Sequence, residues 1–166
     1  MIELLSDMSL KKLIIKEARP KTAFADLFDR MNAINKTKVN TLQAFDYESI
    51  ASRTHLLGAY INAMAAFASH SNKAKSMSME MLLFAAMTDQ IGVAIGTMGA
   101  RGDSKIIIFT NSKKALDGVK DLLTDIKDFD PTPQHARKAL MKLGITNAKD
   151  PDRLLLQRMA TSRLKP

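Results

Sequence analysis

Residues 53–68 read RTHLLGAYINAMAAFA and predict the clearest helix of the chain. Large apolar residues recur in this stretch at spacings of three and four, so one side of the helix is a broad apolar stripe. The stripe consists of Leu56, Leu57, Tyr60, Ile61, Met64 and Phe67. Ala59, Ala63 and Ala66 form a second face of small residues, against which another element can lie closely. We therefore expect this helix to lie in the core, with Leu57 and Ile61 buried.

A second helix is predicted shortly after the first. Its N-cap is Ser76 or Ser78, because a serine hydroxyl accepts a hydrogen bond from a free amide of the first turn. The helix extends to about Met87. Glu80 lies in its first turn, where the helix dipole favours a carboxylate.

The next helix is predicted over Asp89–Met98, with Thr88 as its N-cap. Its apolar residues are expected to point inward, and they are Ile91, Ala94, Ile95 and Met98. Gly99 is expected to end the helix in the left-handed conformation, which glycine adopts without steric cost.

Three more helices are predicted in the last third of the chain, over Lys113–Ile126, Thr132–Gly144 and Asp150–Leu164. The last two begin with an N-cap residue followed by proline, a combination typical of helix starts.

Strand patterns occur at three places: Lys12–Glu17, Val39–Phe45 and Ile106–Phe109. An amphipathic helix, Lys21–Ile34, separates the first two. The pattern as a whole predicts an α+β fold: one helix-rich domain over residues 1–166, with a small central β-sheet packed by helices.

Composition and charge narrow the class of protein. The chain has 166 residues, of which 46% are hydrophobic and 25% charged, a balance that indicates a folded domain rather than a disordered one. Its formal net charge of +8 favours an acidic partner, most often a nucleic acid. The sequence has no cysteine, which fits a cytoplasmic protein, and its apolar runs are too short to span a bilayer.

The sequence contains no recognisable catalytic or metal-ligand pattern. The three histidines, His55, His70 and His135, lie far apart, and none belongs to a metal-ligand motif. No phosphate-binding loop and no pairing of a nucleophile with a base stands out. We therefore expect a protein that is not an enzyme and holds neither a metal nor a cofactor.

Three blocks in the central third resemble a known family. SRTHLLGA (residues 52–59) resembles its xHLLxA helix start, and NKAKSMSMEMLL (72–83) resembles its NIAKS…ExLL segment. Gln90-Ile91 followed by Ala94-Ile95 and Gly99 resembles its RQI…AI…G helix. The family is that of the KEOPS regulatory subunit, which includes the human PRPK-binding protein.

The resemblance implies a non-catalytic role. Subunits of this family bind the small atypical kinase/ATPase of the KEOPS complex. They also hold the 3′ end of tRNA while the transferase subunit installs threonylcarbamoyl on an adenosine beside the anticodon. Such a subunit contributes by positioning, because a tethered tRNA end raises the effective concentration of the anticodon loop at the transferase.

Candidate contact residues follow from the family-like blocks. The basic residues in or beside the turns are expected to contact phosphates, and they are Lys73, Lys75, Arg101 and Lys105. His55 and Gln90 are expected to touch the terminal nucleotides. Asp89 stands where many archaeal members have arginine, and an acid there disfavours a phosphate. In the last helix, residues 151–166, Leu155 and Met159 are expected to dock the kinase.

Two other classes of protein remain open. A small basic DNA-binding transcriptional regulator fits the size, charge and helix content, although no single helix concentrates the basic residues. An enzyme with an unrecognised pocket for a phosphate-rich or small-molecule substrate also fits the charge.

Overall fold

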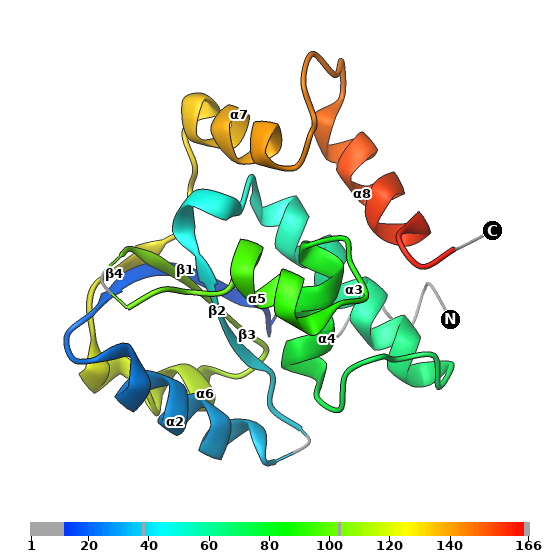
Figure 1. The fold of residues 1–166 in the computed structure, drawn as a ribbon. Helices are drawn as coiled ribbons and strands as arrows, with labels where there is room; N and C mark the ends of the chain where they lie inside the picture. Colours follow the sequence, from blue (N-terminus) through cyan, green and yellow to red (C-terminus); the bar gives the residue numbers. More distant parts are fainter. Residues whose placement is uncertain (1–11, 38, 103, 165–166) are drawn as a thin grey trace. The chain divides into compact units, whose positions relative to one another are not determined.

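The computed structural model describes residues 12–37, 39–102 and 104–164, and Figure 1 shows its fold. These residues form two compact units. The sheet unit consists of the described parts of Met1–Ala44 and Arg101–Phe129, and the helical unit of those of Phe45–Ala100 and Asp130–Pro166.

A four-stranded sheet is the centre of the sheet unit. Its strands are β1 (Ile14–Pro20), β2 (Leu42–Asp46), β3 (Ile106–Thr110) and β4 (Leu123–Asp128), in the order β2-β3-β1-β4. β1 runs antiparallel to both β3 and β4 and brings Ile15 opposite Phe109. All five residues of β3 are buried, as expected for an apolar strand with neighbours on both sides.

Two helices of the sheet unit, α2 (Phe24–Asn35) and α6 (Lys113–Asp117), lie on the same side of the sheet (Figure 1). α2 buries Leu27 and Met31. Arg30 of α2 pairs with Asp121 at 2.6 Å, which fixes α2 beside the segment that follows α6.

The prediction of one long helix over Lys113–Ile126 is wrong. The helix ends at Asp117, a 3-10 turn (η3, Lys120–Leu122) follows, and the chain then enters β4. β4 pairs with β1 through Leu123 opposite Pro20 and Lys127 opposite Glu17. The leucines have helical spacing, but pairing with the distant strand β1 makes this segment a strand. Sequence periodicity alone does not reveal such pairing.

Five helices build the helical unit: α3 (Arg53–Ala68), α4 (Met77–Ala85), α5 (Ile91–Met98), α7 (Pro133–Lys142) and α8 (Pro151–Thr161). A 3-10 turn, η2 (Tyr47–Ser49), precedes α3. α3 packs against α4 and α8, α4 against α5, and α7 against η2. Three helix starts agree with their predicted caps, because Ser76, Thr132 and Asp150 each accept a hydrogen bond from the amide three residues on. The N-cap of α5 is Gln90, so the predicted cap Thr88 is wrong.

The buried side of α3 is its small-residue face together with Leu56 and Tyr60, the part of the apolar stripe that adjoins this face. Ala59, Ala63 and Ala66 are buried, whereas Leu57 and Ile61 are only partly covered. The expectation that Leu57 and Ile61 are core residues is therefore wrong. Small side chains let neighbouring helices approach the α3 backbone closely, and the larger residues then lie at the edges of that contact.

Other boundaries differ locally from the prediction. β2 begins at Leu42, and Val39 is 82% exposed. Gly99 has an extended backbone (φ −66°, ψ 140°) and pairs with Phe45 in an isolated β-bridge, so the expected left-handed stop is wrong. A Cβ at Gly99 would lie 2.5 Å from the Ile95 carbonyl oxygen, which explains the glycine. The helix-rich α+β class itself is confirmed.

Candidate functional site

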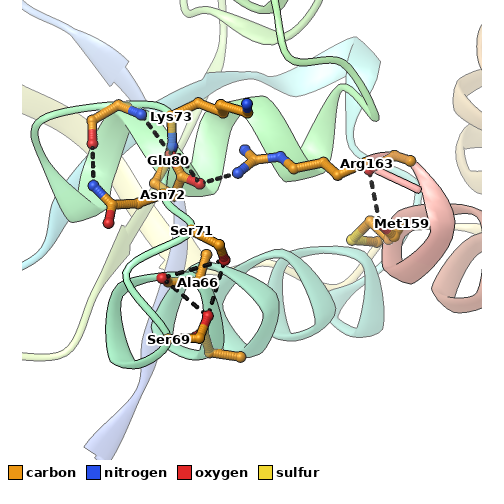
Figure 2. Close-up of polar contacts among 11 residues, drawn as sticks. Ala66, Ser69, Ser71, Asn72, Lys73, Glu80, Met159 and Arg163 are labelled. Carbon is orange, nitrogen blue, oxygen red and sulfur yellow. Dashed lines mark hydrogen bonds and ion pairs between the residues drawn. The ribbon is translucent and has the colours of Figure 1, made fainter. Parts of the chain in front are cut away.

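The loop between α3 and α4 carries the family-like Asn72–Ser76 block and has a well-defined backbone (Figure 2). Ser69 at the end of α3 donates its hydroxyl to the Ala65 carbonyl oxygen at 2.9 Å. Asn72 donates its side-chain amide to the Ala74 carbonyl oxygen at 2.9 Å. These local hydrogen bonds replace helical ones and hold the chain in a turn.

Glu80 holds this loop from the side of α4. Its carboxylate is fully buried and accepts hydrogen bonds from the backbone amides of Lys73 (3.0 Å) and Ala74 (2.7 Å). The same carboxylate forms an ion pair with Arg163, which follows α8 (Figure 2). The sequence predicts Glu80 in the first turn of this helix. In the structure Glu80 also joins the loop, α4 and the chain after α8.

Arg163 completes this buried cluster. Its guanidinium carbon lies 4.0 Å from the centroid of the Phe84 ring, so the cation lies over an aromatic face. Because Glu80 supplies the opposite charge, neither ion is buried alone. Sequence reasoning missed this pair, since the two residues are 83 positions apart and neither belongs to a pattern that links them.

The Glu80 anchor fixes the backbone of Lys73, and the Lys73 and Lys75 side chains are exposed. Within the described structure neither ammonium group has an ion-pair partner. The arrangement presents two cations from a backbone that is already ordered. The loop backbone therefore needs no further ordering when the two side chains meet a partner.

His55 is not a surface residue, which contradicts its expected contact with a nucleotide. Its side chain is fully buried, and Nε2 lies 2.9 Å from the Ala85 carbonyl oxygen. The Ala51 amide donates to Nδ1 at 3.3 Å, so the ring is neutral with its proton on Nε2. Burial lowers the pKa of His55 to about 4, although the Ala85 carbonyl acts in the opposite direction. His55 therefore ties α3 to α4.

α5 exposes more apolar surface than the spacing predicts. It buries Ala94 and Met98, whereas Ile91 is 44% exposed, Val93 45% and Ile95 49%. The expectation that Ile91 and Ile95 point inward is therefore wrong. Gln90 caps this helix and is exposed beside Ile91.

The remaining basic candidates belong to the sheet unit. Arg101 is exposed there. Lys105 pairs at 2.7 Å with the buried carboxylate of Glu17, which Lys127 also approaches at 3.2 Å. Burial acts to raise the pKa of Glu17, but the hydrogen bonds and charges of the two lysines outweigh it and hold that pKa below its usual value. Lys105 thus neutralises an internal charge, which conflicts with its expected phosphate contact.

Leu155 and Met159 lie inside the helical unit and not on a docking surface. Both are fully buried, and α8 packs on α3. They therefore do not form the expected kinase contact, because their apolar surface is already covered by the chain itself.

Among the described residues, no group of three or more His, Asp or Glu side chains is placed to hold a metal ion. No helix in the described ranges combines the length and apolar character needed to cross a membrane.

A known protein family matches most of the chain, including the helices described above. The model of the family "Kinase binding protein CGI-121" matches residues 20–162, which include the whole of α3, α4, α5, α7 and α8. The chain belongs to the CGI-121 family of kinase binding proteins. No curated protein sequence matches the chain significantly.

Proposed function

We propose that this protein is a non-catalytic regulatory subunit of a KEOPS-type complex, which modifies tRNA in the cytoplasm, and that it docks on the kinase/ATPase subunit through α5. Membership of a family of kinase binding proteins supports a kinase partner. The observation that carries the docking surface is the outer side of α5, where Ile91, Val93 and Ile95 are each almost half exposed.

Such a surface is costly unless a partner covers it. Three large aliphatic side chains on an eight-residue helix are exposed to water, and Ile91 and Ile95 lie one turn apart on the same face. Burying such side chains contributes roughly 25 cal/mol per Å² of apolar area removed from water. A Cβ at Gly92 would meet no atom within 4 Å, so the helix backbone itself is open to a closely packed partner.

Two charge substitutions on α5 test this surface. Ile95→Glu should weaken binding to the complex's kinase/ATPase by about tenfold or more, because a carboxylate would be buried in an apolar contact. Thr97→Glu adds the same charge at another exposed position of α5 and is the matched control. Binding is measured by calorimetry with the purified kinase subunit, after thermal melting shows both variants folded. Full affinity of Ile95→Glu would refute this docking surface.

We also propose that Lys73 and Lys75, with Gln90, contact the 3′ end of tRNA. The support is a pair of exposed lysines, without an ion-pair partner among the described residues, on a loop anchored by Glu80, together with the net charge of +8. Lysine contacts to phosphate contribute salt-dependent affinity without sequence preference, so preference for an unpaired end must come from another group. Gln90 remains for that role, since His55 is buried.

Binding to intact and 3′-trimmed tRNA at several salt concentrations tests this second proposal. Replacing Lys73 and Lys75 by glutamine should weaken binding to both RNAs and flatten the salt dependence. Gln90→Ala should mainly reduce the preference for the intact end. Equal affinity of the unsubstituted protein for both RNAs would refute end recognition, and tighter binding to duplex DNA would favour the DNA-binding alternative.

A further inference from the structure

A groove in the helical unit lies between α7, the loop that follows it and the start of α8. Its volume is about 630 Å³, a size typical of ligand pockets. The turn that forms one wall is tightly held: Ile145 donates its amide to the Leu140 carbonyl oxygen at 2.9 Å, and Gly144 has φ +70°. Arg158 of α8 donates to the carbonyl oxygens of Leu143 (3.2 Å) and Gly144 (3.3 Å). The groove is therefore built by fixed elements.

The floor and walls of the groove are mainly aliphatic. Leu140, Met141 and Ile145 line it together with smaller residues. Met141 is 58% exposed. The flexible thioether side chain is well suited to adapt to an inserted apolar group.

Arg137 supplies the charge of the groove. It lines the groove one turn before Met141, is exposed, and has no ion-pair partner in the described structure. α7 also carries Lys138 and Lys142 and has no acidic residue. Asp150, the acid that precedes α8, is occupied as its N-cap and accepts from the Arg153 amide at 3.0 Å. The groove thus combines an apolar cavity with an unneutralised cation.

We infer that this groove docks a short acidic peptide segment of a partner protein, with an aliphatic side chain in the cavity and a carboxylate on Arg137. A guanidinium and a carboxylate form two parallel hydrogen bonds, so the contact orients the peptide carboxylate in addition to the attraction between the charges. No aromatic ring is among the described residues that line the groove, so a nucleobase has no aromatic face there on which to stack, and this favours a peptide over RNA. The site is separate from the α5 surface and does not depend on it.

Methyl NMR of the whole chain with three defined probes tests the inference. The probes are the acidic peptide acetyl-EELLDLLEE-amide, its basic counterpart acetyl-KKLLKLLKK-amide and a short oligouridylate. The acidic peptide should shift the methyl signals of Met141 and Ile145 in a saturable way, and the other two probes should not. Saturation of these signals by oligouridylate alone, equal responses to both peptides, or no response to the acidic peptide would overturn the inference.

Two neighbouring charge reversals separate the groove from general electrostatic attraction. Arg137→Glu should weaken binding of the acidic peptide by about tenfold or more, since it places a carboxylate against the carboxylate of the ligand. Lys138→Glu makes the same change in net charge on the next residue of α7, which does not line the groove, and should reduce affinity by less than threefold. Equal losses in the two variants would show that net charge alone attracts the peptide, and the inference would then be wrong. Both positions are exposed, so both variants are expected to fold.

Discussion

Gly58 of α3 faces Leu156 of α8 so closely that a Cβ at Gly58 would overlap the leucine side chain. The end of the Met159 side chain would lie 3.3 Å from the same Cβ. The absence of a side chain at Gly58 therefore lets α8 lie directly on α3. This contact makes the last helix part of the core of the helical unit.

Substitutions at Gly58 should distinguish a close contact from a loose one. Gly58→Ala should change the free energy of unfolding by less than about 1 kcal/mol, because Leu156 is 37% exposed and its side chain can turn away, and alanine favours the helix. Gly58→Phe should cost about 1–3 kcal/mol, since α8 must move. Chemical denaturation of both variants measures this difference. Equal stability of the phenylalanine variant and the parent would show that α8 does not pack there.

Truncation of Met159 tests its place in the core. Met159→Ala should reduce stability by about 2–5 kcal/mol because the side chain is fully buried. Ile61→Ala, at a partly covered position of α3, should cost less. Urea denaturation compares the two variants under identical conditions. The reverse order would restore Ile61 to the core and place Met159 at the surface.

The Glu80 carboxylate should control both stability and the order of the Lys73 loop. Glu80→Gln leaves the Arg163 cation buried without an opposite charge and should cost about 3–5 kcal/mol. It also weakens the acceptor of the Lys73 and Ala74 amides, whose hydrogen exchange should accelerate. The control is Glu48→Gln, because Glu48 is exposed on η2. Unchanged exchange at Ala74 in the Glu80 variant would argue against the anchor.

Acid should destabilise the protein through His55 before it affects the carboxylates. The pKa of His55 is about 4 in the fold against an ordinary 6.5, so the unfolded chain binds the proton more readily. The stabilisation is complete above about pH 6.5 and is lost as the pH falls toward 4. The loss should reach about 2–3 kcal/mol at about pH 4.5, and the two lysines beside Glu17 hold the pKa of that carboxyl below its usual value.

Urea denaturation at a series of pH values measures this loss, and NMR titration of the His55 ring checks its origin. A ring that titrates near 6.5 in the folded protein would contradict the buried, neutral histidine. A folding free energy that does not change between about pH 6.5 and 4.5 would also contradict the buried, neutral histidine.

The helix starts and the core strand were determined by local sequence. Ser76, Thr132 and Asp150 act on amides three residues away, so the information lies within a single turn. The continuous apolar run Ile106–Phe109 likewise predicts the buried strand β3 without reference to its neighbours.

Tertiary structure decided which faces are buried and which charges are paired. The sequence of α3 shows two apolar faces, and only the packing of α4 and α8 on this helix determines that the small residues are covered with Leu56 and Tyr60 while Leu57 and Ile61 are not. Likewise, β4 exists because β1 supplies its backbone partners, and Glu80 has its role because Arg163 meets it after the chain has folded. Each of these outcomes depends on contacts between residues far apart in the chain, whereas propensity and periodicity report only on neighbours.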